Sequence, residues 1–293
     1  MGNLNVERLS RWICAADELC RELLDATIAA LDHQDAPRDM AHFVLRQLVV
    51  TCHLTSESAI LLLLHNRLWD VEMLMRSVLE GTMKLAFIST SDKTLRESRA
   101  DEYWNILPDM DRLRDHERLV ALLADVDNPD DDEWRPFRDM LLDASMIDEL
   151  RQKYPRSMRR KLQHQWTFNE LAKKVSPPNS SNSKFNNFRA FAHAYAIGSH
   201  LLHQDGVATG VILDHSSRSS LRRTSKEFVH ASRVTQDLVV FSYFRAQFIY
   251  RMLQISVKPI NGIHARWEEC AKEISAAGME WRAIEYGDVN DPD

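Results

Sequence analysis

Apolar residues recur about every 3.6 positions along almost the whole chain, which is the spacing of helices that bury one face. No stretch shows a convincing alternation of apolar and polar residues, the pattern typical of a strand. The pattern therefore predicts an all-α, multi-helix bundle. Its expected helices cover residues 6–31, from about 37 to 65, 68–89, 93–107, 134–154, 184–203, 226–255 and 263–277.

Breaks in the helical pattern suggest how the chain is organised. Residues 125–133 form an acidic loop, 176–183 are a Ser-, Pro- and Asn-rich linker, and 204–210 are expected to turn. Pro108 is expected to end the helix before it, since proline breaks a helix interior. No internal repeat is present. We expect a single helical domain over residues 1–283, with a helical insertion over roughly 92–183 and an acidic, disordered tail over 284–293.

Composition supports a helical, soluble protein. The 293 residues include only 8 Gly, and the 44% hydrophobic and 27% charged fractions are ordinary for globular proteins. The net charge of −6 gives no global attraction to nucleic acid. The longest apolar run, 59–64, is far short of the ~20 residues of a membrane span, so we expect no membrane association. With no secretory signal and no Cys-x-x-Cys pair, we expect a cytoplasmic protein with reduced thiols at Cys14, Cys20, Cys52 and Cys270.

Two of the expected helices carry polar residues on otherwise apolar surroundings. Arg76 and Glu80 lie four residues apart in one helix, and Ser199 and His203 lie four apart in another, with Tyr195 one turn before Ser199. Residues four apart share one side of a helix. Ionised groups on an apolar helix are costly unless they pair or do chemistry. These five residues are therefore the candidate site, and we expect them to meet in a partly buried polar pocket.

Each pair has a structural and a functional interpretation. Arg76 and Glu80 are either an intrahelical salt bridge packed against a neighbour, or a pair in which Glu80 orients Arg76 toward an anionic ligand. Ser199 and His203 either satisfy each other and the backbone, or place His203 as a general acid or base oriented by Ser199 and Tyr195. A serine hydrolase is disfavoured, because no Gly-x-Ser-x-Gly turn is present.

The order of these residues resembles a bacterial family known as domain-of-unknown-function family 5677. The resemblance covers roughly residues 45–206 and rests on Arg76-x-x-x-Glu80, then Trp166, then Tyr195-x-x-x-Ser199-x-x-x-His203. It implies a helical protein with no agreed activity, in which the same five residues matter. The chain departs from the family at residues 204–206, where Gln-Asp-Gly replaces the usual small residues or proline.

A functional Arg and His in a helical bundle are also similar to the HEPN superfamily of metal-independent ribonucleases. The pattern of that superfamily, Arg, four to six residues, then His, occurs at Arg46/His53, Arg159/His164 and Arg223/His230. Three occurrences are about the number that chance gives for this composition. The pattern therefore carries no weight, although Arg76 and His203 could still form such a pair across helices.

Cofactor motifs are absent from the sequence, and one basic run suggests a partner. There is no His-Glu-x-x-His, glycine-rich phosphate loop or Gly-x-Gly-x-x-Gly, so we expect no cofactor and no metal. A cluster of basic residues could meet an RNA backbone, or could simply be solvated helix surface neutralised by the acidic loop. The sequence neither requires nor rules out a homodimer. The basic residues are Arg151, Lys153, Arg156, Arg159 and Arg160.

Two functions follow from these observations. The first is metal-independent RNA cleavage of a toxin or phage-defence type, in which Arg76 binds phosphate and His203 acts as acid or base. The second is a non-catalytic binding or scaffold protein, in which the Arg/Glu and Ser/His pairs are structural. A small-molecule-binding module is a third interpretation. An open cleft lined by these residues would favour catalysis, whereas a closed, hydrogen-bonded network would favour a structural role.

Overall fold

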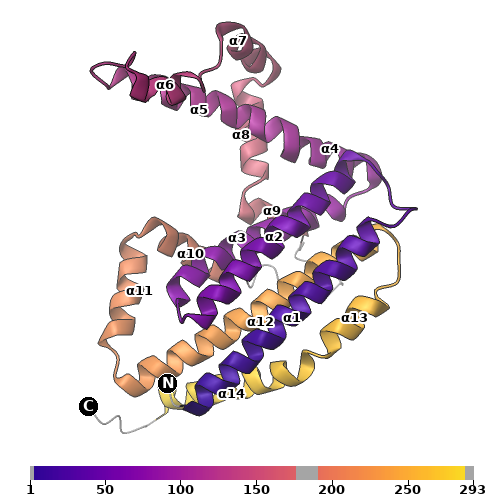
Figure 1. Cartoon of the computed structure of the whole chain (residues 1–293), viewed down its shortest axis with the longest axis vertical. Coiled ribbons are helices and arrows are strands. Elements are labelled where there is room, and N and C mark those ends of the chain that lie inside the picture. The colour runs from indigo at the N-terminus through magenta and orange to yellow at the C-terminus, as the bar shows by residue number, and fades with distance from the viewer. Residues whose placement is uncertain (1–2, 176–190, 288–293) are drawn as a thin grey trace.

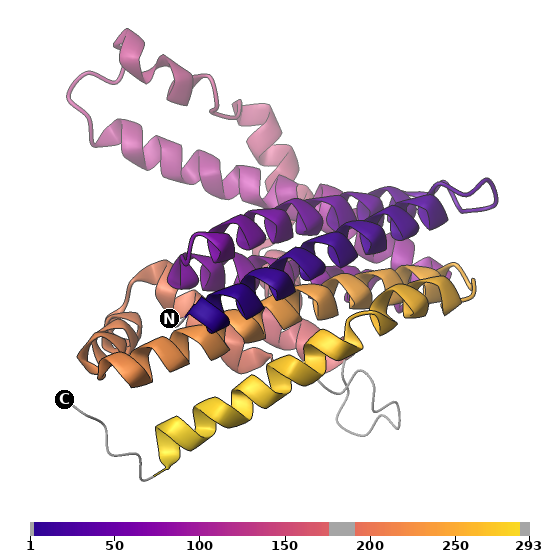
Figure 2. The ribbon, with the colours of Figure 1, turned by 60° about the horizontal axis from the view of Figure 1, so that its bottom comes forward.

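The computed structural model describes residues 3–175 and 191–287, and within these ranges all regular structure is helical (Figure 1). This confirms the all-α prediction. The bundle is formed by long helices that lie side by side, and two further helices return along it at the C-terminal end (Figure 2). The long helices are α1 (Asn3–Leu31), α2 (Met40–Leu64), α3 (Leu68–Ser89) and α12 (Ser220–Met252), and the returning ones are α13 (Lys258–Ala265) and α14 (Glu268–Tyr286).

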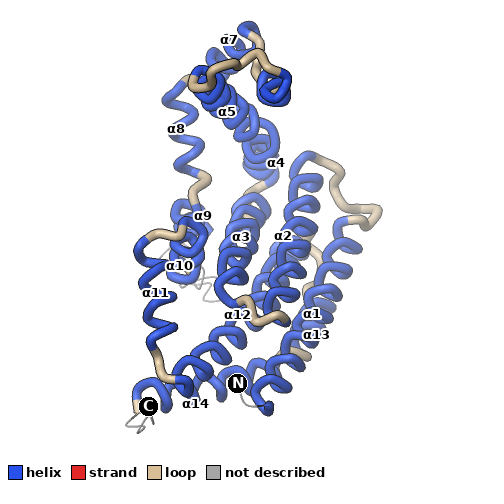
Figure 3. Tube along the Cα trace, turned by 60° about the vertical axis from the view of Figure 1, so that its left-hand side comes forward, coloured by secondary structure: helices blue, strands red, loops and turns tan. Residues whose placement is uncertain are grey.

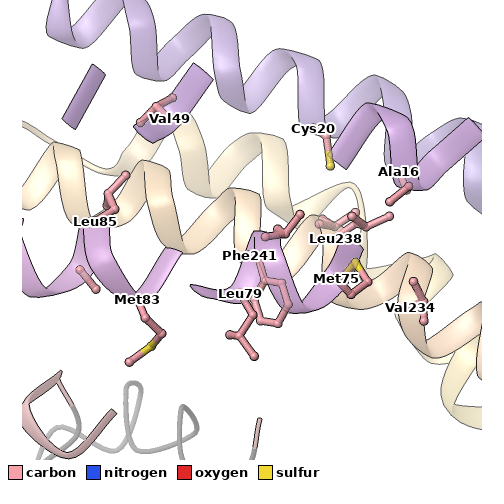
Figure 4. Close-up of a cluster of buried hydrophobic side chains, with 14 of the residues drawn as sticks. Ala16, Cys20, Val49, Met75, Leu79, Met83, Leu85, Val234, Leu238 and Phe241 are labelled. Carbon is pink, nitrogen blue, oxygen red and sulfur yellow. The ribbon is translucent and has the colours of Figure 1, made fainter. Parts of the chain in front are cut away.

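The core of the bundle is made by side chains that meet from four helices. Figure 4 shows Ala16 of α1, Val49 of α2, Leu79 of α3 and Leu238 of α12 in one buried cluster. Burial of such side chains contributes about 1.5–3 kcal/mol each, so the long helices hold one another in place. By length and composition α2 is apolar enough to cross a membrane, but almost half of its most apolar stretch is buried inside the bundle. This is typical of a core helix.

One continuous helical path leaves the bundle after α3. It begins as α4 (Lys93–Asp101), passes through a π-helical turn, η1 (Glu102–Ile106), and continues as α5 (Leu107–Ala124). The prediction that Pro108 ends this helix was wrong. Pro108 lies in the first turn of α5, where its missing N–H and its ring are tolerated because the π turn before it has already broken the regular hydrogen-bond ladder.

Helices α5 to α8, residues 107–165, project from the bundle and are called the arm (Figure 3). The arm has its own small core, which explains how it keeps its shape away from the bundle. The predicted helix 134–154 is broken in two, because Asp143 caps a new helix by accepting a hydrogen bond from the Met146 N–H. The core residues are Met110, Leu113, Leu150, Tyr154 and Leu162, and the remaining arm elements are η2 (Asp132–Trp134), α6 (Arg135–Arg138), α7 (Ala144–Lys153) and α8 (Arg156–Gln165).

The chain returns from the arm through α9 (Phe168–Val175), which packs on α3. After the gap it forms α10 (Ala192–His203) and α11 (Gly206–Ser217). The turn predicted for 204–210 is shorter than expected. Gln204 adopts a left-handed conformation, and Asp205 then caps α11 through the Val207 and Ala208 N–H groups. The predicted linker 176–183, the start of the predicted helix 184–203 and most of the predicted tail lie outside the described residues.

Candidate functional site

Helix α10 lies against α3, and a glycine lets the two backbones approach closely. A β-carbon added at Gly198 would lie 2.8 Å from the Glu72 carbonyl oxygen and 2.9 Å from the Arg76 Cβ. No larger residue fits there without moving a helix. The two helices run in opposite directions, since Tyr195 meets the Arg76–Glu80 turn while Gly198 meets the turn before it. This crossing brings the two sequence motifs together.

Tyr195 joins Arg76 and Glu80 across the two helices. Arg76 Nη2 donates a 3.0 Å hydrogen bond to the Tyr195 hydroxyl, and that hydroxyl donates a 3.3 Å hydrogen bond to Glu80 Oε2. Arg76 and Glu80 themselves are 4.0 Å apart. Lys84, one turn further along α3, donates a 2.8 Å hydrogen bond to the other Glu80 oxygen. We call Arg76, Glu80, Lys84 and Tyr195 the tyrosine cluster.

Charge and burial compete at this cluster. Burial alone raises the pKa of Glu80, but the positive charges of Lys84 and Arg76 and the hydrogen bonds to Glu80 outweigh it, so the pKa lies below its usual value. For Tyr195, burial and the Glu80 carboxylate raise the pKa of the phenol, and Arg76 only partly opposes them. Both shifts favour the same state at neutral pH, an ionised Glu80 that accepts a hydrogen bond from the neutral Tyr195 hydroxyl.

The Tyr195 ring is held from both sides. The Phe168 ring of α9 stacks on it with centroids 3.9 Å apart and planes 5° from parallel. The Arg76 guanidinium carbon lies 4.8 Å from the centroid of the same ring, within the range of a cation–π contact. Tyr195 therefore fastens α10 to both α3 and α9.

Ser199 and His203 are placed differently from Tyr195. Neither side chain makes a hydrogen bond or an ion pair with another described residue, and His203 is exposed. The buried residues of α10 are Gly198 and Leu201, whereas Leu202 on the predicted face is largely exposed. The buried face is thus turned by roughly a quarter of a turn from the predicted one, at ~100° per residue. The reason is Gly198, whose lack of a side chain draws that face onto α3.

The tyrosine cluster resembles a closed network more than an open cleft. Five cavities of about 310–530 Å³ lie elsewhere in the described structure, and none of these five is lined by Arg76, Glu80, Tyr195, Ser199 or His203. Among the side-chain atoms of the tyrosine cluster, only Arg76 Nε is buried without a hydrogen-bond partner. Most of the polar capacity of the cluster is therefore used within the protein.

A second polar cluster lies between α3 and α12 and was missed by the sequence analysis. Glu72, whose side chain is only 2% exposed, pairs with Arg233 and has His230 Nε2 at 2.7 Å. Arg233 also bonds Asp237 at 2.8 Å. Arg233 and Asp237 are four residues apart on an apolar helix, the same signal that singled out Arg76 and Glu80.

The two carboxyl groups of this second cluster are driven in opposite directions. Burial raises the pKa of Glu72, but contacts with His230 and Arg233 lower it by more, so the net shift is downward. Burial raises the pKa of Asp237 to about 6, helped by the Glu72 charge and opposed by Arg233. Glu72 is therefore held ionised, while the carboxyl group of Asp237 has a pKa close to neutral pH.

The basic run lies on the arm and divides into paired and unpaired residues. Arg151 lies 3.7 Å from Glu117, and Lys153 lies 3.7 Å from Asp109. The side chains of the other three predicted residues, which lie on α8, make no ion pair or hydrogen bond in the part of the chain that the structure describes. They line one cavity of about 460 Å³ between α5 and α8. The lining residues, called the arginine pocket, are Met110, Arg114, Glu117, Arg156, Arg159, Arg160 and Gln163.

The acidic loop does not neutralise this pocket by direct contact. No described ion pair joins residues 125–133 to residues 151–161. Instead Arg138 holds the loop, with its Nη1 donating to the Pro129 and Asp131 carbonyl oxygens. Nor do the described residues contain a group of three or more His, Cys, Asp or Glu side chains placed to hold a metal ion.

Comparison with known proteins places the chain by family. A family model described as a family of unknown function (DUF5677) matches residues 42–219, which include α3, the arm, α10 and every residue of the tyrosine cluster. No curated protein and no solved structure matches the chain. The match extends the resemblance seen over residues 45–206 at both ends and covers more than half of the sequence. The chain therefore belongs to the family of unknown function DUF5677.

Proposed function

We propose that this protein binds a phosphate polyanion, RNA in the first instance, through the arginine pocket of the arm. The observation that carries the proposal is that Arg156, Arg159 and Arg160 surround one cavity without an acidic partner among the described residues. Arginine side chains present a planar, permanently charged fork that matches phosphate oxygens. Three such groups left unpaired in a protein of net charge −6 favour an external anion.

The position of the pocket supports the same function. The arm projects from the bundle (Figure 3), so α8 is open to a long polyanion that the bundle does not have to accommodate. Two nearby carboxylates pair with arginines other than the three on α8, since Asp111 pairs with Arg114 at 2.6 Å and Glu117 with Arg151 at 3.7 Å. The pocket therefore keeps a local positive charge that the overall composition conceals.

In this proposal the tyrosine cluster is structural. It fastens α10 to α3 and α9, and it corresponds to the interpretation of Arg76/Glu80 as a salt bridge that packs against a neighbour. Metal-independent cleavage by Arg76 and His203 stays a prediction that the geometry does not favour. Arg76 is bonded to Tyr195, and no described contact brings His203 to it.

The test is salt-dependent binding of a labelled, single-stranded RNA of mixed sequence, followed by fluorescence anisotropy. Each phosphate contact contributes a slope of about −0.7 in a plot of log K against log salt for a single strand. We therefore expect Arg159→Gln and Arg160→Gln each to weaken binding and to reduce the slope by about 0.7. The matched control is Arg135→Gln, the same change on the same arm but outside the pocket, paired with Asp139 at 3.6 Å.

Two results would contradict the proposal. One is RNA affinity and salt slope that stay the same in the α8 variants and in the control. The other is binding of an acidic peptide at equal net charge as tightly as RNA, because the pocket would then select charge and not phosphate.

A further inference from the structure

Helix α2 presents a row of uncharged residues to solvent along most of its length. Phe43, Leu54 and Leu61 are 42%, 55% and 59% exposed. The positions between them on the same side are Gln47 and Ser58, which are also uncharged. We call this surface, with the partly buried Val50, the α2 stripe. It extends beyond α2 through Trp104, which packs edge-on against Phe43 with centroids 4.8 Å apart and is itself exposed.

Such a row calls for an explanation. Single exposed apolar residues are ordinary on protein surfaces, but a contiguous apolar patch marks an interaction site. The opposite side of α2 is already buried in the bundle through residues such as Val49 and Cys52. The helix is therefore apolar on both sides, and only one side is covered within the chain.

We propose that the α2 stripe is the interface of a homodimer, in which α2 packs antiparallel against α2 of a second copy. The two-fold axis passes between the two α2 helices, perpendicular to both, at the level of Cys52. The proposal is independent of RNA binding by the arm, and its interface uses no residue of the arginine pocket.

The apolar residues of the stripe are arranged symmetrically about this level. Phe43 lies nine residues before Cys52, and Leu61 lies nine residues after it. Val50 and Leu54 lie two residues before and two after. An antiparallel two-fold pairing therefore sets Phe43 opposite Leu61 of the second copy, and Val50 opposite Leu54, each contact occurring twice as an isologous interface requires.

The charges beside the stripe fit the same pairing. Arg46 lies six residues before Cys52 and Glu57 five residues after it. Their separation of eleven residues is about three helical turns, so both lie along the same edge of the stripe. The two-fold axis places this edge of both helices on the same side of the interface, so that Arg46 of each copy meets Glu57 of the other. This complementarity is why we choose a second copy as the occupant, since a lipid surface has no such matched pair.

Both charged residues are accessible for this role. Arg46 is 38% exposed and lies 3.4 Å from the exposed Asp32, and Glu57 is 41% exposed and lies 3.4 Å from the buried His53. An exposed pair such as Arg46–Asp32 contributes little to the stability of the chain, and burial lowers the pKa of His53, which weakens its attraction for Glu57. Arg46 and Glu57 can therefore turn toward a second copy at small cost.

The first experiment measures mass in solution by size-exclusion chromatography with light scattering, over a range of protein concentrations. We expect the full chain at twice its 34.0 kDa mass. Leu54→Glu should raise the dissociation constant at least about tenfold, because it puts a carboxylate at the centre of an apolar interface. The matched control is Leu213→Glu on α11, where the side chain is 68% exposed and away from the stripe; it should remain dimeric.

The second experiment tests the register by exchanging charges. Arg46→Glu and Glu57→Arg should each weaken the dimer, because each brings like charges together. The double variant should recover most of the loss. Since the neighbours Asp32 and His53 are unchanged, recovery reports the contact between copies and not the contacts within one chain.

Three results would overturn the proposal. A monomeric wild-type chain at all concentrations would do so, and so would a dimer that Leu54→Glu leaves as stable as the control does. A monomer that co-sediments with phosphatidylcholine vesicles through the stripe would assign the surface to lipid instead. Circular dichroism of each variant separates a lost dimer from a lost fold.

Discussion

Replacing Gly198 by alanine tests whether α10 is docked on α3 as closely as the structure shows. In an ordinary helix interior this change stabilises the folded state by up to about 1 kcal/mol, because alanine is the better helix former. At Gly198 the added β-carbon meets the Glu72 carbonyl oxygen at 2.8 Å. A backbone atom of a core helix cannot move aside as a flexible side chain can. We therefore expect the sign of the effect to reverse.

The magnitude follows from two opposing contributions. Overpacking of a close contact costs typically about 1–3 kcal/mol, and the gain in helix propensity offsets up to about 1 kcal/mol of it. A matched position separates the two. Gly210 lies inside α11, and a β-carbon there would meet nothing within 4 Å, so Gly210→Ala shows the propensity gain alone. The two variants should differ by about 1–3 kcal/mol, with Gly198→Ala the less stable.

The assay combines thermal unfolding with hydrogen exchange. For a chain of this size, 1 kcal/mol corresponds to roughly 2–4 °C in Tm. Because α10 can release from the bundle before the bundle itself unfolds, exchange should also quicken locally in α10 in the Gly198→Ala variant. If Gly198→Ala melts at or above Gly210→Ala and its α10 amides stay equally protected, the close approach of the two helices is wrong.

Of four further predictions, three concern the polar clusters and the last concerns His203. Tyr195→Phe keeps the ring stack but leaves Arg76 and Glu80 without their shared hydroxyl, so it should lose about 1–2 kcal/mol in urea unfolding; wild-type stability would argue that the cluster is solvated. The pKa of Glu80 is lowered on folding, so its contribution is complete above the usual carboxyl range and is lost as pH falls through the folded value; Glu80→Gln should therefore flatten the acid limb of the stability profile. The pKa of Asp237 is raised to about 6, so its contribution is complete below the ordinary aspartate pKa and is lost as pH rises through about 6; Asp237→Asn should remove that loss, and an unchanged profile would contradict the assignment. With chelator present, His203→Ala should leave any RNA cleavage by the purified protein unchanged. Loss of cleavage in a His203→Ala protein that is still folded would instead restore His203 as a catalytic residue.

Local signals in the sequence predicted the long helices of the bundle and three of the four residues of the tyrosine cluster. The pair Arg76 and Glu80 is visible because both residues lie on one helix, and the residues of α3 were predicted with its observed bounds. Tyr195 was singled out by its own motif. Lys84 and Phe168 were not, because a stacking ring from α9 and a third charge on α3 acquire meaning only once the helices are packed.

The errors have physical causes of the same kind. The inner face of α10 was misjudged because a glycine adds no apolar signal, although Gly198 makes the closest contact of that helix. The sequence analysis expected a turn over residues 204–210 and no helix directly after it, whereas Asp205 supplies a cap that starts α11 at Gly206. Glu72 was overlooked because its partners, Arg233 and His230, come from a helix about 160 residues away in sequence.

The π-helical turn at Glu102–Ile106 determines the direction in which the arm faces. A π turn holds one residue more than the α-helical path around it. Deleting a single residue there would restore a regular helix from α4 into α5 and rotate everything beyond it by ~100° about the helix axis. Contacts of the same turn oppose that rotation, because Tyr103 packs against the bundle core, Ile106 packs against the arm core, and Glu102 accepts hydrogen bonds from Gln165 and Trp166 of the returning chain. The arm therefore leaves and returns at one fastened point, and a single-codon insertion or deletion there should disturb the packing at its base as well as the direction of its binding face.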